Sequence, residues 1–249
     1  MSEAGCEFCQ DRGWVVDLAT NRARRCSCHS ARVRSRRLED LGVPPKYQGC
    51  RLSNFRLAGD VGDQLLRARH DCDEYIDEFL ENDGSLSERG LVFVGPSGRG
   101  KTHLAVAVLI ELAEQYGVRG RFVDFTKLVA DIQSTFQPGN ELSQTDLLRP
   151  LQEADVVVVD ELGARRPTPF VLDILYLLIN GRYMAKRPTL FTSNYDLAAE
   201  GEDDVSAGQT LADRVSASLV SRLHHMAKPI RISDDVGDYR HDVQAHQHR

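Results

Sequence analysis

The stretch GPSGRGKT at residues 95–102 decides the fold, because it matches the phosphate-binding pattern G-x-x-x-x-G-K-[ST] at every fixed position. The short apolar run GLVFV at 90–94 comes directly before it, and a segment with helical spacing of apolar residues follows from residue 102. A strand, a glycine-rich turn and a helix in this order form the setting in which the pattern binds nucleotide phosphates. The sequence therefore predicts a nucleotide-binding loop within an α/β domain.

Each part of this loop has a physical role in holding phosphate groups. Gly95, Gly98 and Gly100 allow the backbone to approach the phosphates closely, because no Cβ atom intrudes. Lys101 is expected to reach the β- and γ-phosphates, and the hydroxyl group of Thr102 is expected to bind Mg²⁺. The predicted nucleotide-binding residues are Gly95, Pro96, Ser97, Gly98, Arg99, Gly100, Lys101, Thr102 and His103.

Polar side chains follow two further apolar runs. VVVV at 156–159 is expected to form a strand buried on both faces, with Asp160 at its tip to hold Mg²⁺. Glu161 comes next, where a carboxylate can orient and deprotonate the attacking water. Asn194 ends the run PTLFTSN, where an amide can sense the γ-phosphate or help to place the water. The three side chains together predict nucleotide hydrolysis.

Strands and helices alternate from residue 90 to residue 233, which predicts a parallel sheet with helices on both faces. Pro150 is expected to kink or split one of these helices, because proline removes a backbone donor from the helix. Helices are expected at 60–82, 102–117, 126–136, 146–154, 168–185 and 211–226, and further strands at 121–125, 188–194 and 230–233.

The last predicted helix carries two arginines, Arg214 and Arg222, eight residues apart and therefore roughly on one face. An exposed arginine on a helix is usually only solvated. One of these two could instead complete the site of a neighbouring subunit as an arginine finger. The spacing does not decide between them.

Four segments in this order resemble the AAA+ ATPases of the DnaC/IstB-like group, which comprises bacterial helicase loaders and transposition helpers. They are GPSGRGKTHLA, VVVVDELG, LFTSN and the VSRL segment. The resemblance covers roughly residues 43–240 and includes the linker GVPPKYQGCRLSNF. It implies a P-loop AAA+ core with three α/β/α layers around a parallel sheet.

The resemblance also implies ATP as the ligand, self-association with ATP sites at subunit interfaces, and single-stranded DNA as a partner. Residues 223–249 are too few for the helical lid domain of most AAA+ enzymes, and the loaders of the group similarly lack this lid. No role is assigned to the acidic loop at 196–209. The implied assignments are Walker A for Lys101 and Thr102, Walker B for Asp160 and Glu161, sensor 1 for Asn194 and the arginine finger for Arg222.

A cysteine cluster with the spacing C-x2-C-x16-C-x-C-H lies near the N-terminus. The segments WVVDL and RARRC are expected to form a hairpin that brings its two halves together. Four thiolates in two close pairs suit tetrahedral Zn²⁺, and clustered thiols in a reducing compartment indicate metal rather than disulfides. The predicted ligands are Cys6, Cys9, Cys26 and Cys28, with His29 as an alternative to Cys28.

Charge is distributed unevenly along the 249 residues. Residues 1–52 carry ten Lys or Arg and six Asp or Glu side chains, a net +4, so the remaining residues carry −10 against a total of −6. The acidic total argues against a generic DNA-coating protein, whereas the basic N-terminal region permits contact with nucleic acid or an acidic protein surface. No apolar run approaches the ~20 residues needed to cross a bilayer and no secretory signal is visible, so a cytoplasmic protein without membrane contact is expected.

These observations predict a small zinc-ribbon-like module with a basic helix at 1–42, an ATPase domain at 43–240 and a disordered tail at 241–249. The predicted function couples ATP binding and hydrolysis to delivery of a DnaB-like hexameric helicase onto single-stranded DNA. Some loaders of the group have a zinc-bearing N-terminal domain that binds the replicative helicase, and the N-terminal region here looks similar. The main alternative is an IstB-like transposition helper that binds DNA and a transposase.

Two other classes of protein are compatible with the phosphate-binding loop. A small-molecule P-loop kinase would normally need a substrate lid and would not need Glu161 or Arg222. A zinc adaptor without enzymatic activity would bind ATP only as a structural ligand.

Overall fold

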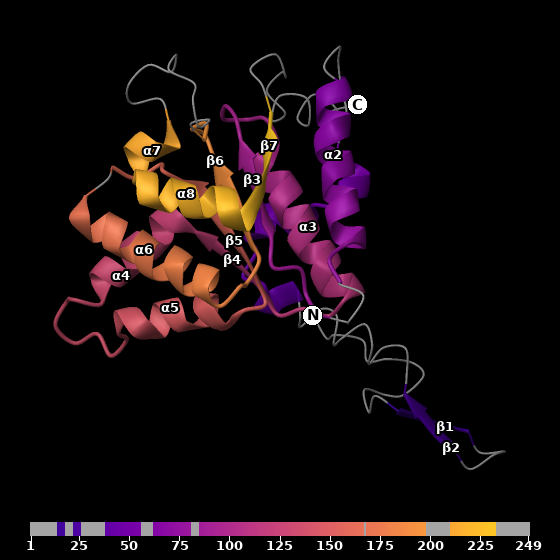
Figure 1. The fold of residues 1–249 in the computed structure, drawn as a ribbon. Coiled ribbons are helices and arrows are strands. Elements are labelled where there is room, and N and C mark those ends of the chain that lie inside the picture. The colour runs from indigo at the N-terminus through magenta and orange to yellow at the C-terminus, as the bar shows by residue number, and fades with distance from the viewer. Residues whose placement is uncertain are drawn as a thin grey trace, which may run out of the picture.

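A five-stranded parallel sheet lies at the centre of the described part of the chain (Figure 1). The computed structural model describes residues 14–17, 22–25, 38–55, 62–80, 85–166, 168–197 and 210–232. The strands follow the order β4-β5-β6-β3-β7 across the sheet. They are β3 (Gly90–Val94), β4 (Gly120–Asp124), β5 (Val156–Leu162), β6 (Thr189–Ser193) and β7 (Ala227–Arg231).

Helices cover both faces of this sheet (Figure 1). One face is covered by α2 (Gly62–Asp77) and α3 (Lys101–Gln115). The opposite face is covered by α4 (Phe125–Ser134), α5 (Gln144–Glu153), α6 (Pro169–Met184), α7 (Leu211–Arg214) and α8 (Ala217–Met226). The predicted three-layer α/β/α core is therefore confirmed.

The four valines of β5 explain why both faces are covered. Val156 and Val158 pack in the core on the α2–α3 side, whereas Val157 and Val159 pack in the core on the α4–α8 side. All four are fully buried, as expected for a central strand of a parallel sheet.

Two helix ends follow the signals in the sequence. Thr168 caps α6 by accepting a hydrogen bond from the Val171 N–H, and Pro169 occupies the first helical position. At the end of α3, Gly117 has a φ of 70° and donates to the carbonyl of Ala113, as a helix-terminating glycine does.

The structure corrects three expectations about element boundaries. Helix α5 continues through Pro150, because a capping box at its start and two buried leucines hold it in one piece. Strand β7 begins at Ala227 rather than at residue 230. It includes Pro229, which an edge strand tolerates because one side of its backbone has no partner strand.

The segment predicted as one helix at 211–226 forms two, α7 and α8. The side chain of Ser216 accepts a hydrogen bond from the Leu219 N–H and so caps a new helix inside the segment. The two arginines therefore lie on different helices, and the argument that placed them on one face was wrong.

A buried arginine joins the amino ends of two central strands. The side chain of Arg182 on α6 is fully buried and donates hydrogen bonds to the carbonyls of Ala154 (2.9 Å) and Pro188 (2.7 Å) and to Oγ1 of Thr189 (2.7 Å). Burial lowers the pKa of Arg182 to about 9. These bonds fix the starts of β5 and β6 relative to each other, at the end of the sheet opposite to the phosphate-binding loop.

A linker packs onto α3 before the first strand of the sheet. It contains two short 3-10 helices, η1 (Pro45–Tyr47) and η2 (Leu52–Asn54). The Leu52 N–H donates to the carboxylate of Glu111 at 2.7 Å, and Arg51 forms an ion pair with Glu114 at 2.9 Å. Leu41 is also buried in this core, so the packed domain begins before the linker.

The N-terminal strands β1 (Trp14–Asp17) and β2 (Arg22–Arg25) form an antiparallel pair, which confirms the expected hairpin strands. The predicted zinc ligands, most of the predicted basic helix, and the tail at 241–249 lie outside the described residues. Among the helices in the described ranges, none has both the length and the apolar character of a membrane span.

Candidate nucleotide-binding site

The phosphate-binding loop connects β3 to α3 and is shaped by three glycines. Gly95, Gly98 and Gly100 have φ values of 140°, 82° and 83°, a region that side-chain-bearing residues rarely adopt. A Cβ atom on Gly95 would lie 1.9 Å from the carbonyl oxygen of Ile232. The loop therefore requires glycine for its backbone geometry as well as for the approach of phosphates.

Lys101 holds a positive charge inside this loop. Its side chain is 6% exposed, and Nζ donates to the carbonyl oxygens of Gly95 (2.7 Å) and Pro96 (2.6 Å). The loop thus folds around the ammonium group at the N-terminus of α3, where the helix dipole also favours an anion. The residues present fit a nucleotide phosphate group.

A hydroxyl and a carboxylate meet beside the loop. Thr102 Oγ1 donates to Asp160 Oδ1 at 2.9 Å, and Thr192 Oγ1 donates to the same oxygen at 2.6 Å. Hydroxyl and carboxylate oxygens are the hard ligands that Mg²⁺ prefers. The contact between Thr102 and Asp160 joins the loop to β5 and provides a donor set that fits Mg²⁺.

Burial raises the pKa of Asp160, although the hydrogen bonds from Thr192 and Thr102 act in the opposite direction. Asp124 also raises it, because this residue is the register partner of Asp160 on the neighbouring strand β4. A cation at this position would relieve both effects, since it stabilises the ionised carboxylate.

Glu161 lies within β5, not after it, because the strand continues to Leu162 with a register irregularity between Val159 and Leu162. Its φ is 59°, an unusual value for a residue other than glycine. The Glu161 N–H donates to Thr192 Oγ1 at 2.9 Å, and the side chain is exposed. The backbone is fixed while the carboxylate is accessible, as a base for water would need to be.

Asn194 follows β6, which lies between β5 and β3 in the sheet. The preceding residue Ser193 is the register partner of both Val94 on β3 and Leu162 on β5. The fold therefore brings the exposed Asn194 to the edge between the phosphate-binding loop and Glu161.

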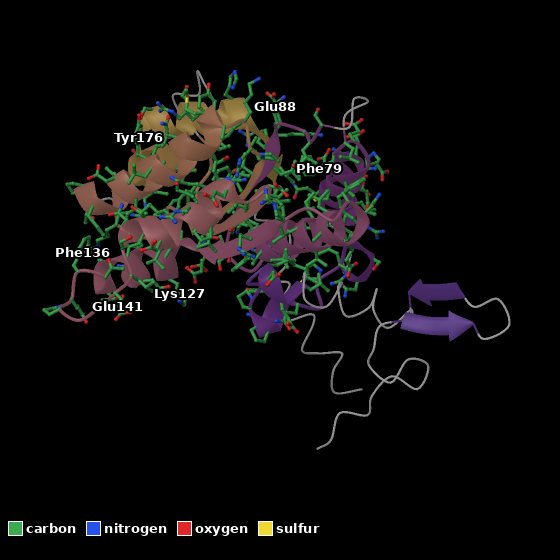
Figure 2. The ribbon with its side chains drawn as sticks, turned by 90° about the horizontal axis from the view of Figure 1, so that it is seen from below. Phe79, Glu88, Lys127, Phe136, Glu141 and Tyr176 are labelled. Carbon is green, nitrogen blue, oxygen red and sulfur yellow. The ribbon has the colours of Figure 1, made fainter. Side chains whose placement is uncertain are left out.

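The structure separates the two candidate arginines. The Nε of Arg214 donates to the Gly163 carbonyl at 3.0 Å, so this side chain lies beside the turn after Glu161 in its own subunit. The Cζ of Arg222 lies 5.4 Å from the ring centroid of Tyr176 on α6. Figure 2 shows Tyr176 on the side of the molecule formed by the helices of the α4–α8 layer, away from Phe79, which lies just after α2.

His103 is oriented toward the linker. Its Nε2 lies 3.1 Å from the carbonyl oxygen of Arg51, and its ring centroid lies 5.2 Å from that of Phe55. Burial lowers the pKa of His103, so the neutral ring is favoured. Its predicted contact with nucleotide stays a prediction.

Comparison of the chain with known proteins identifies its family. The family model of IstB-like ATP binding proteins matches residues 54–245. The chain belongs to this family. Family membership confirms the resemblance to the DnaC/IstB-like AAA+ ATPases and makes this a nucleotide-binding protein.

Individual relatives include a replicative helicase loader. The replicative helicase loader DnaC of Escherichia coli (strain K12) is 29% identical over 193 residues, which cover 76% of this chain and 71% of DnaC. The phage-like element PBSX protein XkdC of Bacillus subtilis (strain 168) is 25% identical and covers 88% of this chain and 82% of its own length. The crystal structure of the DnaC helicase loader superposes with a TM-score of 0.63 at 28% identity, covering 76% of this chain and 99% of that chain.

Sequence reasoning missed two residues of this IstB-like site, Thr192 and Asp124. The signal for Thr192 was a pair of hydroxyl residues inside an otherwise apolar run, LFTSN, because a fully buried hydroxyl needs a partner. Asp124 gave no signal, since its relation to Asp160 depends on which strands pair.

Proposed function

We propose that this IstB-like protein is an ATP-dependent loader that delivers a DnaB-like hexameric helicase onto single-stranded DNA in DNA replication. The observation that carries the proposal is the contact of Thr102 with Asp160 in a chain homologous to the loader DnaC. The protein would act in the cytoplasm, where replicative helicases load.

The residues of the site divide the work of hydrolysis. Lys101 would bind the β- and γ-phosphates, and Thr102 and Asp160 would hold Mg²⁺. Bound Mg²⁺ would supply neutralisation of the charge that develops on the phosphate oxygens. Glu161 would accept the proton of the attacking water, and Asn194 would orient that water at the γ-phosphate.

Self-association would complete the site in trans. We assign the arginine finger to Arg222, because its guanidinium group is on the outer surface beside Tyr176 and donates only to Ser218 on its own helix among the hydrogen bonds described for it. A neighbouring subunit could therefore receive this side chain without disruption of the core. The finger would stabilise the transition state of the neighbour's ATP.

The N-terminal region would form a zinc module that binds the helicase. Pairing of Trp14 with Arg25 brings the first residue of β1 beside the last residue of β2. This topology suits two pairs of ligands, Cys6 with Cys9 and Cys26 with Cys28. The basic residues of this region would bind an acidic surface of the helicase or DNA.

A loading assay tests this function. The full chain, a hexameric replicative helicase, ATP and a circular single strand would be mixed, and helicase bound to the circle would be counted. We expect loading that requires ATP and is lost with Lys101→Ala. If the chain loads no helicase but binds duplex DNA together with a transposase, the proposal is wrong and the transposition helper is right.

A further inference from the structure

We infer that Arg214 is a positioning residue of its own subunit, which holds the turn after Glu161 against the segment that carries Asn194. The inference rests on the proposed ATP hydrolysis and deepens it, because it concerns how the same site places its base. The sequence left Arg214 as a second candidate for a finger that acts in trans. Its contacts in the structure indicate a role in cis.

The guanidinium group of Arg214 contacts both segments of the site. Its Nε donates to the carbonyl oxygen of Gly163 at 3.0 Å, and Nη2 lies 3.5 Å from the carbonyl oxygen of Ala164. Its Cζ lies 4.7 Å from the ring centroid of Tyr195, within the range of a cation–π interaction. Tyr195 directly follows Asn194, so one side chain connects the turn after Glu161 to the residue after Asn194.

The turn after β5 needs this support because of its backbone. Glu161 and Gly163 have φ values of 59° and 85°, and the Ala164 N–H closes the turn on the Glu161 carbonyl at 3.1 Å. A left-handed conformation at a residue other than glycine persists only where neighbours hold it. Thr192 holds the turn from β6 at its start, and Arg214 holds it from α7 at its end.

The turn and α7 are in close van der Waals contact. A Cβ atom on Gly163 would lie 2.9 Å from Leu211 Cδ1, 3.2 Å from Tyr195 Cδ2 and 3.3 Å from Arg214 Cβ. The Leu211 N–H also donates to the Asp196 carbonyl at 2.8 Å, which attaches α7 to the segment after Asn194. A displacement of that segment would therefore move Arg214, and with it the turn that places Glu161.

The test compares kinetics of four full-length variants. Arg214→Ala removes the contacts, and Arg214→Lys keeps a positive charge but loses the planar group that donates and stacks. Arg149→Ala is the matched control, because Arg149 is an exposed arginine whose ion pair, to Asp146 at 3.5 Å, lies on α5 away from the site. Arg222→Ala is the comparison for a residue that acts in trans.

The expected result for Arg214→Ala is a fall in kcat of ~10- to 100-fold, the size expected for a misplaced catalytic group, with unchanged affinity for a non-hydrolysable ATP analogue. Arg214→Lys should lose part of this activity, and Arg149→Ala should lose none. Mixing Arg214→Ala with Lys101→Ala protein should restore nothing, because each subunit's own site is defective. The same mixture made with Arg222→Ala should regain activity.

Any of three results would overturn the inference. Arg214→Ala that hydrolyses ATP at the wild-type rate would show that the contacts do not position the base. Arg214→Ala that regains activity when mixed with Lys101→Ala would make Arg214 a finger in trans. If Arg214→Ala does not fold, a wild-type kcat for Arg214→Lys overturns it equally. Absence of hydrolysis by the wild-type chain would instead refute the proposed function.

Discussion

Thr192 accepts a hydrogen bond from the Glu161 N–H at 2.9 Å and donates one to Asp160 at 2.6 Å. A single hydroxyl group on β6 therefore fixes both acidic residues of β5. The two carboxylates differ in environment as a result. Asp160 is held inward and 6% exposed, whereas Glu161 is held by its backbone with its side chain accessible.

Replacement of Thr192 by valine should weaken the positioning of both Asp160 and Glu161. Thr192→Val keeps the shape of the side chain and removes the hydroxyl, which should destabilise the fold by about 1–3 kcal/mol because Asp160 loses a buried donor. Hydrolysis should fall and the Mg²⁺ dependence should shift to higher concentration. Thr192→Ser, which keeps the hydroxyl, is the control, and equal rates for the two variants would contradict the assignment.

The raised pKa of Asp160 predicts how stability changes with pH in the absence of Mg²⁺. The folded state holds this proton more tightly than the unfolded state, so the favourable contribution is present at low pH and is lost as pH rises through the folded pKa. Asp160→Asn should therefore raise the Tm of the nucleotide-free protein at about pH 8 and have little effect near pH 4. Denaturation scans at both pH values measure this, and a variant less stable than wild type at high pH would argue against it.

Replacement of Glu161 by glutamine should separate binding from hydrolysis. Glu161→Gln should bind ATP as wild type does and lose ~10²- to 10⁴-fold in kcat, the range for loss of a general base. Lys101→Ala should instead lose nucleotide binding, because it removes the positive charge of the loop. Calorimetry with an ATP analogue and steady-state phosphate release give the two quantities. Normal turnover by Glu161→Gln would exclude Glu161 as the base.

Arg222 should act on a neighbouring subunit. Arg222→Ala should lose ~10³- to 10⁵-fold in kcat, as loss of an arginine finger does. Mixing it with Lys101→Ala protein should restore some hydrolysis, because one mixed interface pairs an intact loop with an intact finger. Activity that does not depend on protein concentration would speak against a site shared between subunits.

The N-terminal cysteines should bind one zinc ion per chain. Metal analysis of the purified protein should find this ion, and Cys9→Ser should lose it. The remaining cysteines, Cys50 and Cys72, should not contribute to the measurement, because both are buried in the core of the described domain. Zinc retained in full by Cys9→Ser would refute the ligand set.

The position of Leu41 decides where a deletion that tests the proposed zinc module should end. Leu41 is 2% exposed and its carbonyl accepts a hydrogen bond from the Phe122 N–H at 2.6 Å. A deletion of residues 1–42 would take this residue from the core, whereas a deletion of residues 1–37 leaves it in place. The shorter deletion should abolish helicase binding and leave ATP affinity unchanged. Helicase binding by the truncated chain would show that the module has another partner.

The sheet and the phosphate-binding loop were predictable because local signals decide them. The glycines of the loop, the apolar strand GLVFV and the four valines of β5 each require one conformation and one environment. Gly117, which ends α3, is an equally local signal. The start of β7 and the break between α7 and α8 were not predictable in this way. A proline can end a strand or lie within an edge strand, and a serine can lie inside a helix or cap a new one, depending on the tertiary setting of Pro229 and Ser216.

The contacts between residues of the site depend on the order of the strands in the sheet, which cannot be read from the sequence. Asp124 influences Asp160 because β4 pairs with β5, and Thr192 reaches both acids because β6 lies beside β5. The different roles proposed for Arg214 and Arg222 depend on a helix break two residues after Arg214. Spacing along one assumed helix could not reveal it.

The linker before β3 has a mechanical consequence. His103 lies in the first turn of α3 and contacts the Arg51 carbonyl, while Glu111 and Glu114 on the same helix bind the backbone of Leu52 and the side chain of Arg51. The linker thus contacts α3 near both ends of this helix. A pulling force on the chain ahead of residue 51 would therefore act on the helix that begins with Lys101. Tension from a bound partner would reach the nucleotide phosphates through these three contacts.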